Sequence, residues 1–168
     1  MDKDNYLKLR NKYLPEALKL IFILESPPAS GKYFYNETGK TTEPLFNEMM
    51  KTFHYKPADK KDGLEFFKSQ GFFLVDSTYK PVNKMKGKER EATILSDFGN
   101  LVADLEAING KQSPLVLVKA NICRFLENQT NIIIRVWGLT SLKVRPPIGM
   151  AGAWERGGKD APRNISLT

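Results

Sequence analysis

The stretch Leu20-Ile21-Phe22-Ile23-Leu24, which stops at Glu25-Ser26-Pro27-Pro28, decides the fold of this chain. An unbroken apolar run that ends in a polar segment with prolines is typical of a buried strand that leads into a loop. The run Phe72-Phe73-Leu74-Val75 repeats the pattern and stops at Asp76. Strands that are apolar at every position are typical of a parallel sheet covered on both faces.

The segments around these two runs predict an alternation of helices and strands. Two further strands are predicted at 114–118 and 131–134, and helices are predicted at 43–53, 63–70, 88–108 and, briefly, 122–126. A helix over 4–19 precedes the first strand and is interrupted by Pro15. Alternating strands and helices predict an α/β fold of three layers, α/β/α, with a central, mostly parallel sheet of four strands.

The 168 residues suit one domain, but the last part of the chain breaks the pattern. Residues 136–168 are rich in glycine and proline and show no apolar period. We therefore expect the α/β domain to span 1–135 and residues 136–168 to form a disordered or atypical, mildly basic tail.

The bulk composition narrows the class of protein. Its first residues do not resemble a secretory signal, and no apolar run approaches the ~20 residues that span a bilayer, so we expect a cytoplasmic protein without a membrane partner. With Cys123 as the single cysteine, an internal disulfide, an all-cysteine metal site and an iron–sulfur cluster are excluded. We expect a monomer without metal or cofactor. The net charge of +7 favours a polyanionic partner such as DNA.

Ligands of parallel α/β folds lie at the carboxyl ends of the strands. That rule selects the rigid loop that begins with Glu25 and Ser26, and it selects Asp76. The run Tyr33-Phe34-Tyr35 follows the first loop. We expect that three consecutive aromatics cannot all face one core, so that at least one points into a cleft and can stack on a flat ligand. The alternative is that Phe34 is core and both tyrosines lie on the surface.

A basic run follows the second strand. Lys84, Lys86 and Lys88 precede or begin a predicted helix, where positive charge opposes the helix dipole. Either they contact phosphates or they form an ordinary solvated face.

At this point the loops resemble those of a known family. Ile23-Leu24-Glu25-Ser26-Pro27-Pro28, followed by Gly31 and Phe34, resembles the first motif of the uracil-DNA glycosylase superfamily. The segment 73–76, with Pro81 downstream, resembles the second strand of that family and its following loop. The resemblance covers about residues 20–134 and rests on the order and spacing of the motifs, since each motif alone is unspecific.

The resemblance implies excision of a base that is flipped out of the DNA stack, by hydrolysis of its N-glycosidic bond. It implies that Glu25 or Ser26 orients the water, while Phe34 stacks on the base and Asp76 reads its edge. Pro27 and Gly31 would complete the base site. The lysines at 84, 86 and 88 would contact the DNA backbone.

The sequence also departs from the family. Pro28 stands where the closest branch has Gly, and Asp76 stands where an Asn pairs with uracil. An ionised Asp offers only acceptors, so it suits an exposed amino group better than uracil. The final motif, which has a His in most of the superfamily, is missing after Arg135. Two alternatives therefore stay open: a non-catalytic nucleic-acid-binding module of the same fold, and a protein that binds a small nucleotide.

Overall fold

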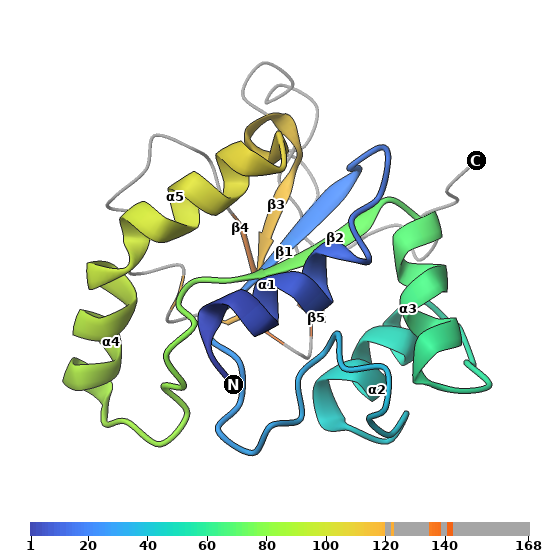
Figure 1. Ribbon diagram of the computed structural model, residues 1–168, viewed down its shortest axis with the longest axis horizontal. Coiled ribbons are helices and arrows are strands. Elements are labelled where there is room, and N and C mark those ends of the chain that lie inside the picture. Colours follow the sequence, from blue (N-terminus) through green and yellow to red (C-terminus); the bar gives the residue numbers. More distant parts are fainter. Residues whose placement is uncertain (120–121, 123–134, 139–140, 143–168) are drawn as a thin grey trace.

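The computed structural model describes residues 1–119, 122, 135–138 and 141–142. Three parallel strands form the centre of the fold: β1 (Leu20–Leu24), β2 (Phe72–Asp76) and β3 (Leu115–Leu117), in the order β2-β1-β3. The predicted mixed α/β fold with a parallel sheet is confirmed for these strands. Figure 1 shows them crossing the middle of the molecule, with helices around them.

Two short strands continue the sheet beside β3. β4 (Arg135–Gly138) pairs with β3 in parallel, and β5 (Ser141–Leu142) pairs with β4 antiparallel. The predicted strand at 131–134 lies outside the described residues, as do the predicted helix at 122–126, apart from Ile122, and most of the predicted tail.

β1 lies in the middle of the sheet because its side chains are apolar on both faces. Its side chains at Ile21 and Ile23 are fully buried, and it pairs with β2 along its whole length and with β3 over part of it. A polar side chain at these positions would lose its hydration without gaining a partner.

The helices lie where the apolar spacing predicts them, with two corrections. Their bounds are α1 (Lys3–Asn11), α2 (Pro44–Thr52), α3 (Lys60–Ser69), α4 (Gly87–Ser96), α5 (Phe98–Ala107) and a short 3₁₀ helix, η1 (Gly110–Gln112). In Figure 1, α1 crosses in front of the strands, with α4 and α5 on one side and α2 and α3 on the other. The first correction is that α1 ends at Asn11, well before the predicted residue 19, since Pro15 cannot continue a helix.

The second correction concerns the predicted helix 88–108, which is two helices that meet at Asp97. The backbone of Asp97 has left the helical region (φ −96°, ψ 5°). Its carboxylate accepts a hydrogen bond from the Thr78 hydroxyl at 2.5 Å and lies 3.0 Å from the Lys80 ammonium. These partners lie on the loop after β2, so a tertiary contact breaks a helix whose apolar period is continuous.

The aromatic run after β1 is wholly buried, so the expectation that three consecutive aromatics cannot share one core is wrong. Tyr33, Phe34 and Tyr35 are exposed by only 1%, 3% and 0%. The chain turns here, with the Asn36 amide donating to the Tyr33 carbonyl, so the side chains do not alternate as in a strand. Tyr33 packs on Tyr6 of α1, Phe34 on Phe46 of α2, and Tyr35 on Phe73 of β2.

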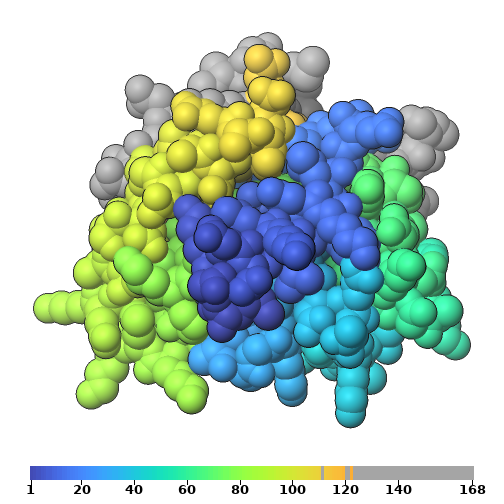
Figure 2. All heavy atoms as spheres, viewed as in Figure 1, coloured from blue at the N-terminus to red at the C-terminus, as the bar shows by residue number. Residues whose placement is uncertain are grey.

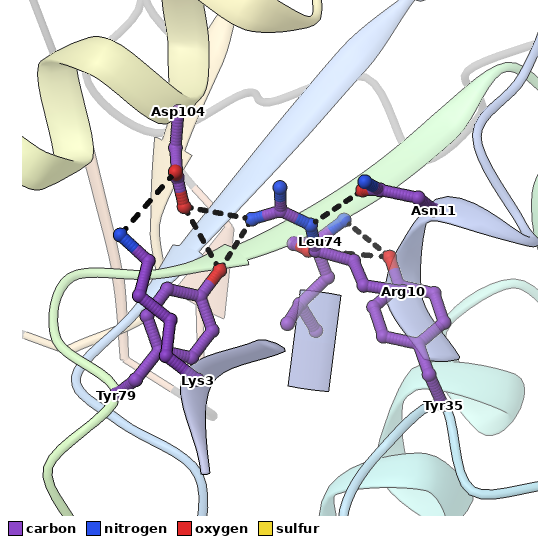
Figure 3. A network of polar contacts seen from close by, with 7 residues as sticks. All are labelled: Lys3, Arg10, Asn11, Tyr35, Leu74, Tyr79 and Asp104. Atoms are coloured by element: carbon purple, nitrogen blue, oxygen red, sulfur yellow. Dashed lines mark hydrogen bonds and ion pairs between the residues drawn. The ribbon is translucent and has the colours of Figure 1, made fainter. Parts of the chain in front are cut away.

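Tyr35 caps the outer edge of the sheet. Its hydroxyl accepts from the Leu74 amide at 2.7 Å and donates to the Leu74 carbonyl at 3.2 Å (Figure 3). Because β2 is the edge strand, these groups would otherwise be open to another strand.

Candidate functional site

Glu25 follows β1 directly and lies where the ends of two strands meet. Its side chain is 4% exposed, and its Oε2 atom lies 2.5 Å from the ammonium of Lys119, which stands two residues after β3. Its Oε1 atom lies 3.8 Å from the guanidinium of Arg90 on α4. A carboxylate with cations on two sides is held in one position at the carboxyl end of the sheet.

Two loops are joined beside Glu25. Arg90 Nε donates to the Val82 carbonyl at 3.2 Å, and the Val82 amide donates to the Ser26 hydroxyl at 3.1 Å. The Ala29 amide donates to Asn83 Oδ1, also at 3.1 Å. The loop after β1 and the loop that leads into α4 are therefore fixed to each other, and Arg90 contacts both the second loop and Glu25.

These loops border a pocket of about 470 Å³, which we call the Glu25 pocket. Its lining includes Glu25, Ser26, Phe34, Glu43, Asn83 and Lys119. The volume lies within the range of small-molecule sites, roughly 300–1,000 Å³. The lining is mostly apolar, with a few charged groups placed around it, which is the usual composition of such sites.

Phe34 forms part of the apolar lining and is itself held by rings. Its centroid lies 5.2 Å from that of Phe67, 5.6 Å from that of Phe46 and 5.1 Å from that of Tyr35. The ring is thus fixed by the core, so a ligand would meet it without an ordering cost.

Glu43, a residue that sequence reasoning missed, also lines this pocket. Its Oε2 atom lies 2.6 Å from the ammonium of Lys60, which is fully buried and also donates to the Tyr33 carbonyl at 2.7 Å. Burial lowers the pKa of Lys60, and the hydrogen bond to Glu43 opposes that effect. A Cβ atom at Gly39 would lie 2.5 Å from Glu43 Oε1 and 2.7 Å from the Lys60 ammonium, so a side chain there would have to displace this ion pair.

Pro27 and Gly31 shape the loop without lining the Glu25 pocket. Pro27 is buried, and Gly31 is exposed with φ +76°. The Gly31 amide donates to the Pro28 carbonyl in a turn, and the positive φ explains why glycine stands there.

Asp76 does not line the Glu25 pocket, although it ends the strand next to β1. It is 2% exposed and lines a second pocket of about 280 Å³, which we call the Asp76 pocket. Glu25, Ser26 and Phe34 therefore line one pocket together, as the sequence predicted, whereas Asp76, which pairs with Leu24 in the sheet, lines another. Its Oδ2 atom has no hydrogen-bond partner among the described residues.

A buried ionic network lies beside the Asp76 pocket, and sequence reasoning missed it (Figure 3). Arg10 is 2% exposed, and its Nη1 atom lies 3.1 Å from Asp104 Oδ2 on α5. The Tyr79 hydroxyl donates to the same oxygen at 3.0 Å. The sequence contained one indication that Arg10 is buried. Helical spacing places it on the same face as Tyr6 and Tyr13, which is the apolar side of α1.

Lys84, Lys86 and Lys88, which we call the rim lysines, are all exposed. They follow Asn83, which lines the Glu25 pocket, and the last of them lies in the first turn of α4. The basic run thus starts at the edge of this pocket. In the view of Figure 2, the yellow and yellow-green residues of α4 and α5 lie to the left of the dark-blue residues of α1.

Neither the described residues nor the comparisons assign a function. Within the described part of the chain, no group of three or more His, Cys, Asp or Glu side chains is placed to hold a metal ion, and no helix is long and apolar enough to cross a membrane. Comparison with protein-family models, with curated proteins and with solved structures finds no match. The resemblance to the uracil-DNA glycosylase superfamily thus stays a prediction.

Proposed function

We propose that this protein binds DNA and accommodates a flipped base in the Glu25 pocket, where it hydrolyses the N-glycosidic bond. The observation that carries the proposal is the position of Arg90. It contacts Glu25, which lines the pocket, and donates hydrogen bonds to the loop that carries the first rim lysines. A carboxylate inside a pocket and a basic rim outside it are the two parts that a base-excising enzyme needs.

The pocket offers a flat base both apolar and polar contacts. Phe34 and Phe46 border the pocket with rings that are 3% and 1% exposed, so they supply apolar lining. Glu43 and Asn83 provide polar groups that can read the edge of a base. Asp76 has no part in the proposal, since it lines the other pocket.

In the proposed reaction, a water molecule attacks the sugar carbon as the bond from that carbon to the base breaks. Glu25 accepts the proton of the water, and Ser26, whose Oγ accepts from the Val82 amide, retains its own hydroxyl proton to donate to the water or the base. The bonding electrons leave with the base, and the ammonium of Lys119 at the pocket edge stabilises that negative charge.

The proposed function also includes expectations about the fold, the oligomeric state, the cellular location and the need for a cofactor. It assumes the three-layer fold with four central strands over residues 1–135, as the resemblance to the uracil-DNA glycosylase superfamily implies. It also assumes a monomer in the cytoplasm that works without metal or cofactor.

A cleavage assay tests the proposal. The full chain is incubated with duplex oligonucleotides that contain uracil, hypoxanthine or a mismatch, and the products are treated with alkali to break the strand at abasic sites. We expect cleavage of at least one substrate and its loss in Glu25→Gln. Glu65→Gln, on an exposed position of α3, serves as the matched control and should cleave normally. Cleavage that survives Glu25→Gln would contradict the mechanism.

One observation favours the second candidate, a non-catalytic nucleic-acid-binding module. Glu25 is 4% exposed and lies 2.5 Å from Lys119, a contact that also suits a purely structural ion pair. In that case the assay shows no cleavage, and the chain binds all oligonucleotides with an affinity that falls steeply with salt. A small-nucleotide-binding protein would show neither behaviour.

A further inference from the structure

The Asp76 pocket contains a carboxylate whose surroundings leave it without a donor. Asp76 is 2% exposed, and its Oδ2 atom has no hydrogen-bond partner in the described part of the chain. Buried acceptors without a partner are rare in folded proteins, and each costs about 1–3 kcal/mol or more when charged. The unpartnered oxygen of Asp76 therefore needs an explanation. Because Asp76 also lines this pocket, a ligand bound in the pocket would supply the missing donor.

Two lysines that line the pocket are directed at other carboxylates. The Lys80 ammonium lies 3.0 Å from Asp97 Oδ1, and the Lys3 ammonium lies 3.9 Å from Asp104 Oδ1. Met1, which carries the α-ammonium group, also lines the pocket and is 64% exposed. The two lysines are thus matched to neighbouring aspartates, while Asp76 Oδ2 has no hydrogen-bond partner among the described residues.

The nearby guanidinium is also used elsewhere. Arg10 donates through Nη1 to Asp104 and to the Tyr79 hydroxyl, and through Nε to Asn11 (Figure 3). A metal ion does not fit the described residues, because no three of their His, Cys, Asp or Glu side chains are placed to hold one. What would complete the site is a compact group with several N–H donors and a positive charge.

We propose that the Asp76 pocket binds a primary alkylammonium group, whose N–H bonds satisfy the Asp76 carboxylate. An ammonium group carries three donors and needs fewer fixed ligands than a metal ion. The volume of about 280 Å³ leaves room for an alkyl chain, and Leu101 and Tyr79 provide apolar surface for it. For comparison, a cavity of ~150 Å³ holds benzene.

Protonation of Asp76 should compete with this ligand. The pKa of Asp76 is raised to about 7, chiefly by burial, with Arg10 on α1 opposing the rise and Asp104 on α5 adding to it. The tyrosines that face it have their own pKa values raised by burial and by the Asp76 charge; they are Tyr6, Tyr33, Tyr35 and Tyr79. Because the ammonium binds the ionised carboxylate, its binding should weaken as the pH falls through about 7.

A titration of the full chain tests the proposal with n-butylammonium chloride as the probe. The Asp carboxyl carbons are labelled with carbon-13, and the pKa of Asp76 is followed by NMR in a buffer without amines. We expect the probe to lower this pKa by about one when its concentration reaches roughly ten times its dissociation constant. Tetramethylammonium chloride, a cation without N–H donors, should leave it unchanged at the same concentration. An equal effect of both salts, or none at about 100 mM, would overturn the proposal.

Two variants locate the binding. Asp76→Asn should bind n-butylammonium at least about tenfold more weakly, a loss of about 1.4 kcal/mol, whereas Glu65→Gln, at an exposed position of α3 that does not line the pocket, should bind it normally. If Asp76→Asn binds as tightly as the native chain, the proposal fails.

Nα-acetyl-lysinamide is the second probe: tighter binding than n-butylammonium identifies a lysine side chain as the ligand, and weaker binding identifies a free amine. The NMR titration decides the question without the variant if Asp76→Asn does not fold.

Discussion

Replacing Asp76 by Asn should stabilise the protein at neutral pH, and the gain should vanish in acid. Burial raises the pKa of this carboxyl from 3.8 to about 7. Because the folded-state pKa lies above the unfolded one, folding takes up a proton between these values. The stability that Asp76 contributes is therefore complete below about pH 4 and is lost as the pH rises through about 7.

The size of the effect follows from the shift. The change from 3.8 to about 7 corresponds to about 4 kcal/mol of stability lost by the native chain between acid and neutral pH. The buried amide of the variant has its own cost of about 1–3 kcal/mol, but that cost does not change with pH. We therefore expect a net gain of about 1–3 kcal/mol near neutrality.

Urea unfolding measures both the pH-dependent loss of stability in the native chain and the pH-independent cost of the buried amide in the variant. The free energies of unfolding of the native chain, of Asp76→Asn and of the control are determined between about pH 2 and pH 8 in a buffer without amines, and the differences from the native chain are plotted against pH. Asp97→Asn is the control, because its stability difference should change with pH in the opposite direction. Burial alone raises the pKa of Asp97, but the hydrogen bonds from Thr78 and Lys80 together lower it. Its loss should therefore cost more at neutral pH than in acid. A difference for Asp76→Asn that is constant over this range would refute the reasoning.

Four further predictions concern the rim lysines, the sheet edge and two glycines. Changing all three rim lysines to glutamine should weaken oligonucleotide binding for every sequence alike and reduce the slope of log affinity against log salt by up to about 3, as measured by fluorescence anisotropy. Tyr35→Phe should lower the free energy of unfolding by about 1–3 kcal/mol in urea, because the amide and carbonyl that its hydroxyl serves on β2 lose their partner. Gly71→Ala should destabilise the fold by more than about 1 kcal/mol, because its φ is +76° and the new Cβ would lie 2.7 Å from the Ala17 carbonyl oxygen. Gly99→Ala, in an open helical position, should instead stabilise it by up to about 1 kcal/mol.

The parts of the fold that the sequence predicted correctly are those decided by local composition. β1 and β2 are apolar at almost every position and stop at a carboxylate, so their bounds follow from burial alone. The split at Asp97 could not be predicted in this way. It depends on Thr78 and Lys80, which lie far from Asp97 in the chain and next to it in space.

The site was predicted in part for a similar reason. The carboxyl ends of parallel strands do meet at one edge of the sheet, so Glu25 and Lys119 lie together as that rule requires. The rule does not say which pocket each side chain borders. Asp76 ends the edge strand, where Tyr79 and the start of α1 enclose a separate pocket, and only coordinates show that division.

The most direct test of the proposed function is whether the Glu25 pocket takes up an unstacked base. Binding of the full chain is compared between a matched duplex and the same duplex with one mismatch, alongside Ser30→Trp, which fills the pocket from its lining. Extruding a mismatched base costs less by up to a few kcal/mol, so we predict at least about tenfold tighter binding to the mismatch. Ser30→Trp should abolish this preference while keeping the salt-dependent affinity. Equal affinity of the native chain for both duplexes would contradict the claim that a base enters this pocket.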